Sequence, residues 1–291
     1  MVRKIRLTTG LILFVFVAGH LINHILGIHS LAAMEAGREW FLAVWRNPVG
    51  TLAFVGAMAV HLLLAAWALY ARRSLKMSMG EAFQLVLGFS IPLFLAIHFV
   101  GTRGSHQMFG TDDTYAYILI VQWKFAEYGV ALQTAGLFAA WIHGCIGLYF
   151  WLRLKPWFNS AKPMLFAVAV LIPVGAWLGY YIGGKEALAL YEDREWRRAV
   201  FNAVNAPDRE GVERIYNIAF LVRVFVGGLI GLAMIGRLVR YVLERRRGTY
   251  VLRYPEDKTV RNVTGTTILE ASRMHGIPHA AVCGGRGRCS T

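Results

Sequence analysis

Six long apolar stretches restrict the fold of this chain more than any other feature of its sequence. A helix needs about 20 mainly apolar residues to cross a bilayer, and each stretch meets that length. The composition agrees, because 56% of the 291 residues are hydrophobic and only 16% are charged. The sequence therefore predicts an all-α polytopic membrane protein with six transmembrane helices. The expected spans are 7–29, 49–71, 80–101, 128–152, 163–183 and 216–240.

The basic residues predict the orientation of these spans. The net charge is +14, and lysine and arginine precede span one and follow spans two, four and six. The segment 185–214, in contrast, holds six basic and seven acidic residues. Because lysine and arginine concentrate in cytoplasmic loops, both termini are expected in the cytoplasm. The positive charge lies where topology requires it, which argues against a nucleic-acid partner.

The pattern changes after residue 247, where we expect a domain boundary between a membrane domain, 1–247, and a tail, 248–291. The stretches YVLRYP and KTVRNV alternate apolar and polar residues and predict a β-hairpin. TTILEASRMHG predicts a short helix. A tail of this length is too short to hold a core of its own. The segment 31–46 is amphipathic and rich in tryptophan, which predicts a helix in the outer membrane interface.

Five of the nine histidines lie inside the predicted spans, where an ionisable side chain is costly and therefore a functional candidate. At a helical rise of about 1.5 Å per residue, His61 and His143 lie about 15 Å from the cytoplasmic ends of their spans. His98 and His24 lie about 26 Å from theirs, and His20 lies one turn lower than His24. Depth favours His24 over His20 as the outer ligand on span one. The candidates are His20 and His24 on span one, His61 on span two, His98 on span three and His143 on span four.

Two layers, each with histidines from two helices, are what a haem with two imidazole ligands requires. No C-x-x-C-H motif occurs, so the expected cofactor is b-type haem, with two haems per chain. Three alternatives remain open. Each histidine can form a hydrogen bond between helices, zinc would need three or four ligands at one level, and a proton relay would use acidic partners that the spans lack.

Polar residues near the outer ends of the spans are further candidates for cofactor binding. Arg223 lies inside span six, where pairing with a haem propionate and snorkelling to the outer surface explain it almost equally well. Arg103 and His106 belong to TRGSHQMFGTDDTYAY, which follows His98 and also contains Asp112 and Asp113. This segment is a candidate quinone site, and a solvated loop is the alternative.

The order of the histidines, with RLTTG in span one and HFVGTR after His98, resembles the dihaem cytochrome b anchor of succinate dehydrogenases and fumarate reductases. The resemblance implies a four-helix haem-binding core. It also implies that His20 or His24 pairs with His98, and that His61 pairs with His143. A sixth span and a cytoplasmic tail depart from the pattern of those respiratory anchors.

The tail GTTILEASRMHGIPHAAVCGGRGRCST resembles a [2Fe–2S] ferredoxin, whose cluster motif is C-x5-C-x2-C followed by a distant fourth cysteine. Cys283 and Cys289 match the first two positions, and the third would fall at position 292. The resemblance implies a ferredoxin module that this sequence contains only in part. It therefore implies that the cluster is complete only in a longer protein.

A six-span anchor followed directly by such a ferredoxin resembles the N-terminal half of a group of bacterial class III adenylate cyclases. The resemblance implies a redox sensor in the bacterial plasma membrane that passes the state of its haems, set by a quinone, to a C-terminal cyclase domain. It also implies a homodimer, and no catalytic residue of the cyclase lies in this chain. The alternative functions are a respiratory electron-transfer subunit and a membrane anchor or transporter without redox chemistry.

Overall fold

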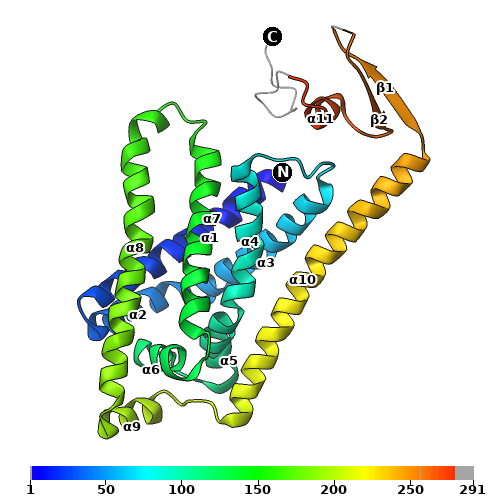
Figure 1. The fold of residues 1–291 in the computed structure, drawn as a ribbon. Helices are drawn as coiled ribbons and strands as arrows, with labels where there is room; N and C mark the ends of the chain where they lie inside the picture. The colour runs from blue at the N-terminus through cyan, green and yellow to red at the C-terminus, as the bar shows by residue number, and fades with distance from the viewer. Residues whose placement is uncertain (1, 256, 279–291) are drawn as a thin grey trace. The chain divides into compact units, whose positions relative to one another are not determined.

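The computed structural model describes residues 2–255 and 257–278, and six of its helices are long and apolar enough to cross a membrane (Figure 1). The predicted number and order of the spans are therefore confirmed, and the chain has the character of a multi-pass membrane protein that lies in a lipid bilayer. The six helices are α1 (Val2–Ile25), α3 (Pro48–Ala71), α4 (Met79–Phe99), α7 (Gly129–Leu152), α8 (Phe158–Tyr191) and α10 (Arg209–Arg246).

Several helices extend beyond the predicted spans. Helix α8 has 34 residues and α10 has 38, because lysine, arginine and glutamate at their ends are good helix formers although they are not apolar. Helix α4 continues through a π-helical turn, Val100–Gly104, into the short helix α5 (Ser105–Phe109). Hydropathy therefore located the membrane-spanning part of each helix and missed its ends.

Short helices connect the long ones. The predicted amphipathic helix is α2 (Leu31–Trp45), and the hydroxyl of its N-cap Ser30 accepts a hydrogen bond from the Ala33 N–H at 3.0 Å. Helix α6 (Tyr115–Ile120) leads into a second π-helical turn, Val121–Phe125. Helix α9 (Arg194–Ala203) lies between α8 and α10.

The chain divides into two compact units. The first comprises Met1–Leu62 and Gly80–Val226, and the second comprises Leu63–Met79 and Gly227–Thr291. The sequence predicted a boundary after residue 247, where α10 ends at Arg246 and a strand begins at Thr249. The division into compact units falls earlier, within α10.

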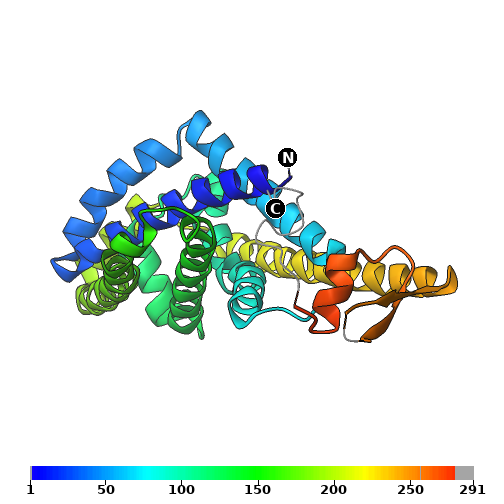
Figure 2. The same cartoon turned by 90° about the horizontal axis from the view of Figure 1, so that it is seen from above.

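In the first unit, α4, α7 and α8 run beside one another and α1 crosses them, as the view in Figure 2 shows. Helices α1 and α8 approach so closely that a Cβ atom on Gly179 would collide with the carbonyl oxygen of His24. Only glycine leaves room for that approach. The indole N–H of Trp141 on α7 donates to the Ala169 carbonyl of α8 at 2.7 Å, and this bond joins the next pair of helices. These contacts position α1 and α7, two of the four helices that carry the histidines.

The second unit contains the predicted hairpin and short helix. Strands β1 (Thr249–Arg253) and β2 (Thr259–Val263) are antiparallel, and α11 (Ile268–Met274) starts with a capping box. Both predicted elements are confirmed. The predicted cluster ligands Cys283 and Cys289 lie outside the described residues, so the ferredoxin assignment remains a prediction.

Candidate functional site

The first unit brings four of the five span histidines together as two pairs of rings. His61 on α3 faces His143 on α7, with ring centroids 6.2 Å apart and ring planes at 89°. His20 on α1 faces His98 on α4, with centroids 6.0 Å apart and planes at 47°. These are the pairings that the sequence predicted, except that it left the choice between His20 and His24 open. We call them the inner pair and the outer pair.

The geometry favours His20 as the partner of His98. The recorded ring contacts of His24 are with His20 at 4.6 Å, Tyr115 at 5.5 Å and Tyr180 at 6.1 Å. The depth estimate pointed to His24 instead. Helix α1 begins at Val2 and crosses its neighbours (Figure 2), so distance along this helix does not measure depth in the bundle.

Each ring of the inner pair has a hydrogen-bond partner at its Nδ1 atom. Nδ1 of His143 lies 2.8 Å from the Gln84 carbonyl oxygen, which can only accept. Nδ1 of His61 lies 3.2 Å from the hydroxyl oxygen of Thr9, and that hydroxyl donates to the Ile5 carbonyl at 2.9 Å. Nδ1 of His143 therefore acts as a donor, and that neutral ring keeps its lone pair on Nε2, the tautomer needed to bind a metal. Nδ1 of His61 can take the same role, because the Thr9 hydroxyl can accept as well as donate.

Two glycines make room for these inner rings. A Cβ atom on Gly88 of α4 would lie 2.6 Å from Cε1 of His143, and one on Gly10 of α1 would lie 3.1 Å from Cε1 of His61. The first distance is shorter than any normal contact, because nonbonded carbon atoms prefer about 3.5–4.0 Å. Each ring is thus held between a hydrogen-bond acceptor and a glycine of the neighbouring helix.

The outer pair is held differently. Nδ1 of His98 lies 3.4 Å from the amide nitrogen of Gln122, whose amide oxygen accepts from the Tyr180 hydroxyl at 2.9 Å. Both ring nitrogens of His20 are buried and have no hydrogen-bond partner among the described residues. Leaving a buried polar group unpaired costs about 1–3 kcal/mol, so the His20 ring is suited to a ligand that would use one of these atoms.

The spacing of both pairs suits a metal that takes two imidazole ligands. Two imidazoles bound on opposite sides of one metal, with bonds of about 2 Å, place their ring centroids about 6 Å apart. Among the described residues, no group of three or more His, Cys, Asp or Glu side chains is placed to hold a metal ion. Each histidine pair thus offers two imidazoles, whereas a structural zinc site takes three or four side chains.

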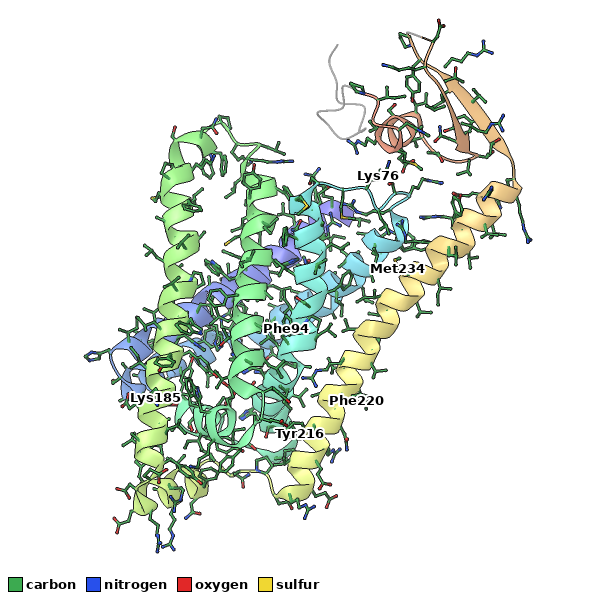
Figure 3. The ribbon with its side chains drawn as sticks, viewed as in Figure 1. Lys76, Phe94, Lys185, Tyr216, Phe220 and Met234 are labelled. Atoms are coloured by element: carbon green, nitrogen blue, oxygen red, sulfur yellow. The ribbon has the colours of Figure 1, made fainter. Side chains whose placement is uncertain are left out.

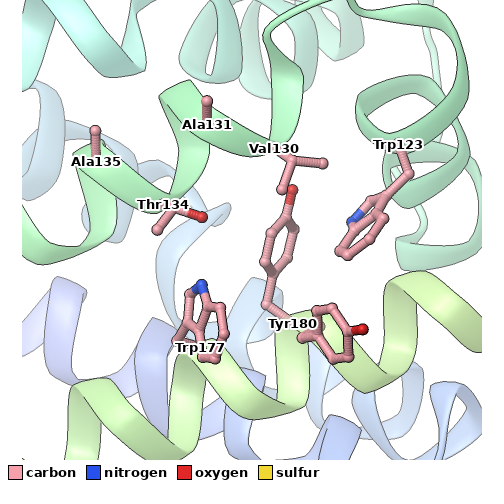
Figure 4. A pocket seen from close by; sticks show the side chains of 8 residues that line it. Trp123, Val130, Ala131, Thr134, Ala135, Trp177 and Tyr180 are labelled. Atoms are coloured by element: carbon pink, nitrogen blue, oxygen red, sulfur yellow. The ribbon is translucent and has the colours of Figure 1, made fainter.

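A pocket of about 460 Å³, which we call the aromatic pocket because half of its lining residues are aromatic, lies between α7, α8 and the turn that carries Trp123. Tyr180 reaches from α8 toward α7 between Trp177 and Trp123 (Figure 4). The Tyr180 hydroxyl donates to Gln122, so two polar contacts link this side chain to His98. The lining residues are Trp123, Val130, Ala131, Thr134, Ala135, Trp177, Tyr180 and Tyr181.

The predicted polar candidates outside the histidine pairs bond to other protein groups. Arg103 donates to the Thr51 hydroxyl at 2.6 Å, and Nδ1 of His106 lies 3.0 Å from the Thr111 carbonyl oxygen. The Nε–H of Arg223 donates to the Leu93 carbonyl of α4 at 3.0 Å. This bond gives the guanidinium inside the span a protein partner. No contact in the described residues brings these three side chains to either histidine pair.

Asp112 and Asp113, the acidic part of the expected quinone loop, pair with arginines. Arg38 binds both carboxylates, and Arg46 binds Asp113. Burial works against the charge on Arg38, but Glu35 and these two aspartates raise its pKa above the ordinary value. Burial also raises the pKa of Glu35, although Arg38 partly offsets this effect. The loop is thus an internally paired charge cluster, which places the aromatic pocket ahead of it as a ligand site.

Sequence reasoning missed the residues that orient the histidines. Thr9 and Gly10 belong to RLTTG, the motif that carried the resemblance, so a signal for them was present. Gly88 and Gln122 had no such signal, because one is an ordinary glycine in an apolar span and the other lies in a connecting segment. No protein-family model matches the chain, and no curated protein and no solved structure matches it significantly.

Proposed function

We propose that this chain is a membrane-embedded redox unit that binds two b-type haems. The observation that carries the proposal is the pair of imidazole pairs, each with ring centroids about 6 Å apart, on four helices of the first unit. His61 and His143 would hold one haem, and His20 and His98 the other. When bound, haem supplies one-electron redox chemistry at an iron atom that the protein keeps away from water.

The surrounding residues have separate roles in this proposal. Thr9 and the Gln84 carbonyl hold the inner imidazoles in the tautomer that exposes Nε2. Gln122 and Tyr180 orient His98 on the outer side. Such partners of a metal ligand fix its ring orientation and adjust its basicity.

The aromatic pocket gives the outer pair a candidate electron donor or acceptor. A quinone has a flat ring with polar oxygens and an apolar tail, which suits a pocket with aromatic walls and one tyrosine hydroxyl. Tyr180 links that pocket to His98 through Gln122. We therefore infer that quinone binds here rather than at the outer loop of Asp112 and Asp113.

The proposed signalling output, a change in cAMP synthesis, rests on the resemblance of the sequence to adenylate cyclase anchors. In the longer protein, the ferredoxin module would pass the redox state of the membrane unit to a cyclase domain that makes cAMP, most simply as a homodimer. The alternative is a respiratory cytochrome b subunit that moves electrons continuously between quinone and a soluble partner.

One experiment separates the sensor from the alternative. The longer protein, reconstituted in lipid nanodiscs, is poised with its haems oxidised or reduced, and cAMP synthesis is measured in each state. A sensor should change its cyclase rate between the two states, and a His61→Ala, His98→Ala double variant should lose the response. Identical cAMP synthesis in both states, with sustained quinol-driven reduction of an added soluble acceptor, would favour the respiratory subunit.

A further inference from the structure

The second unit contains a pocket of about 300 Å³ that the redox proposal does not use. Its lining residues come from α10, from the segment after α3, and from the C-terminal hairpin and helix. Three arginines contribute to the wall, together with Glu244, Thr266 and Met274. The arginines are Arg73, Arg237 and Arg240.

The charges in this pocket are unbalanced. Arg73 pairs with Glu244 at 2.5 Å and with Glu270, which does not line the pocket, at 3.6 Å, so its charge is compensated. Within the part of the chain that the structure describes, Arg237 and Arg240 have no ion-pair partner. Their recorded contacts are neutral: both donate to the Arg72 carbonyl, Arg237 also donates to the Leu69 carbonyl, and Arg240 lies 4.8 Å from the Tyr70 ring. The pocket therefore carries an excess of positive charge.

Capping of the C-terminus of α3 explains only part of the role of Arg237 and Arg240. The Leu69 carbonyl belongs to the last turn of α3 and the Arg72 carbonyl follows that helix directly. Carbonyl groups at a helix C-terminus lack helical partners, and cations are favourable there. A guanidinium has five N–H donors, and the recorded bonds engage one nitrogen of each arginine. Both side chains keep donors for an anion.

The position of the pocket along α10 indicates what kind of anion fits. The preceding turns expose large apolar side chains, including Leu232 at 68% and Ile235 at 60%, as expected of a helix in contact with lipid. Met234 lies among them and lines the pocket, three residues before Arg237 (Figure 3). Arg237 and Arg240 lie at the predicted cytoplasmic end of span six, which the sequence places at residue 240. Phospholipid phosphates are expected near the end of a span.

We propose that this pocket binds the phosphate headgroup of an anionic phospholipid, with the acyl chains along the apolar face of α10. Arginine pockets at the cytoplasmic ends of membrane helices have the charge and shape for such headgroups. Because Thr266 and Met274 line the same pocket, a bound lipid would also contact the C-terminal hairpin and helix. The proposal does not depend on haem.

The test uses the whole chain in nanodiscs of phosphatidylcholine, with or without about one quarter phosphatidylglycerol, and native mass spectrometry to count retained lipid. The wild type should retain phosphatidylglycerol selectively. Arg237→Gln, Arg240→Gln should lower this retention more than tenfold, because both charge-assisted hydrogen bonds to the phosphate would be lost. The matched control Arg245→Gln, Arg246→Gln removes the same charge from the same helix and should retain the lipid. Equal losses in both double variants would overturn the proposal.

A second variant leaves the caps of α3 in place. Met274→Glu places a carboxylate in the pocket and should also lower phosphatidylglycerol retention, whereas Met274→Gln should not. If Met274→Glu retained as much phosphatidylglycerol as the wild type, the proposed lipid site would be wrong. Inorganic phosphate at millimolar concentration should not displace the lipid, and displacement by it would reassign the pocket to a soluble anion.

Discussion

The histidines of the two pairs differ in how their Nδ1 atoms are held, and this difference makes the pairs separable by mutation. The inner rings bond to Gln84 and Thr9, whereas His98 of the outer pair lies against Gln122. No residue is shared between these contacts. Changes to one pair should therefore leave the other intact.

His143→Ala should remove the inner haem and spare the outer one, because the iron would lose one of its two imidazoles. The pyridine haemochrome assay should fall from about two haems per chain to about one, and His61→Ala should act in the same way. His106→Ala is the control, since its ring bonds to the Thr111 carbonyl outside both pairs. Loss of both haems from a variant that keeps its helix content would contradict two independent sites.

Gln122→Leu should change the reduction potential of the outer haem without removing it. If His98 binds iron through Nε2, its Nδ1 carries the proton and needs an acceptor. The Gln122 amide must then turn its oxygen to Nδ1 and its nitrogen to the Tyr180 hydroxyl oxygen, the reverse of the arrangement in the structure; amide orientations are assigned from such networks. Losing that acceptor makes the imidazole a weaker donor and favours the reduced iron. The potential should rise by roughly 40 mV, equivalent to about 1 kcal/mol for one electron.

Gln84→Leu is the matched control for this redox titration. His143 bonds to the backbone carbonyl of Gln84, which the substitution preserves. The potential of the inner haem should therefore stay within a few millivolts of the wild type. If Gln84→Leu shifted the potential of the inner haem as much as Gln122→Leu shifts that of the outer haem, the effect would not be specific to the contact between Gln122 and His98.

At the residue scale, the sequence identified the histidines but not what orients them. Burial of ionisable residues in apolar stretches is visible in the sequence, and so is their order along the chain. The contacts of Gln122 and Gly88 arise from helices packed side by side, and neither spacing nor composition records such packing. Only the structure distinguishes His20 from His24 as the partner of His98, because it shows that α1 crosses the neighbouring helices.

Helices α4 and α7 meet where the His143 ring lies against Gly88, and this contact can be tested as a property of the two elements. Gly88→Ala adds a Cβ atom 2.6 Å from Cε1 of His143, which must push the ring or the helix away. The inner haem should be lost or bound with markedly lower affinity, while the outer haem remains.

Gly56→Ala on α3 controls for the change from glycine to alanine in a helix. A Cβ atom at this position meets nothing within 4 Å. Alanine favours a helix over glycine by about 1 kcal/mol, so this variant should keep both haems and be as stable as the wild type or slightly more so. Full haem content in Gly88→Ala, by spectral titration with added haem, would refute the role of the helix contact.

At the element scale, the sequence predicted the six spans, the amphipathic helix α2, the hairpin and helix α11. Long apolar runs, helical amphipathicity and alternation of apolar and polar residues are local signals, and the spans, α2 and the hairpin each show one of them. The π-helical turns Val100–Gly104 and Val121–Phe125 had no such signal. Their residues fit an ordinary helix, and only packing selects the wider turn.

For the whole molecule, the distribution of basic residues predicts both termini on the cytoplasmic side. In a background where Cys145, Cys283 and Cys289 are serine, Ser74→Cys should be protected from a membrane-impermeant maleimide in intact spheroplasts. Arg198→Cys, in the segment between α8 and α10, should react. Labelling of Ser74→Cys and protection of Arg198→Cys would show that the topology is the opposite of the predicted one. Labelling in lysed spheroplasts is the control, because both cysteines should react there.

Binding of two haems is the central claim, and counting them is the most direct test. The purified chain, expressed with sufficient haem supply, should contain about two haems by pyridine haemochrome assay. Its reduced-minus-oxidised spectrum should be that of low-spin iron with two imidazole ligands. A haem content of zero in folded protein would contradict the proposed redox unit, and the histidine pairs would then be structural contacts between helices.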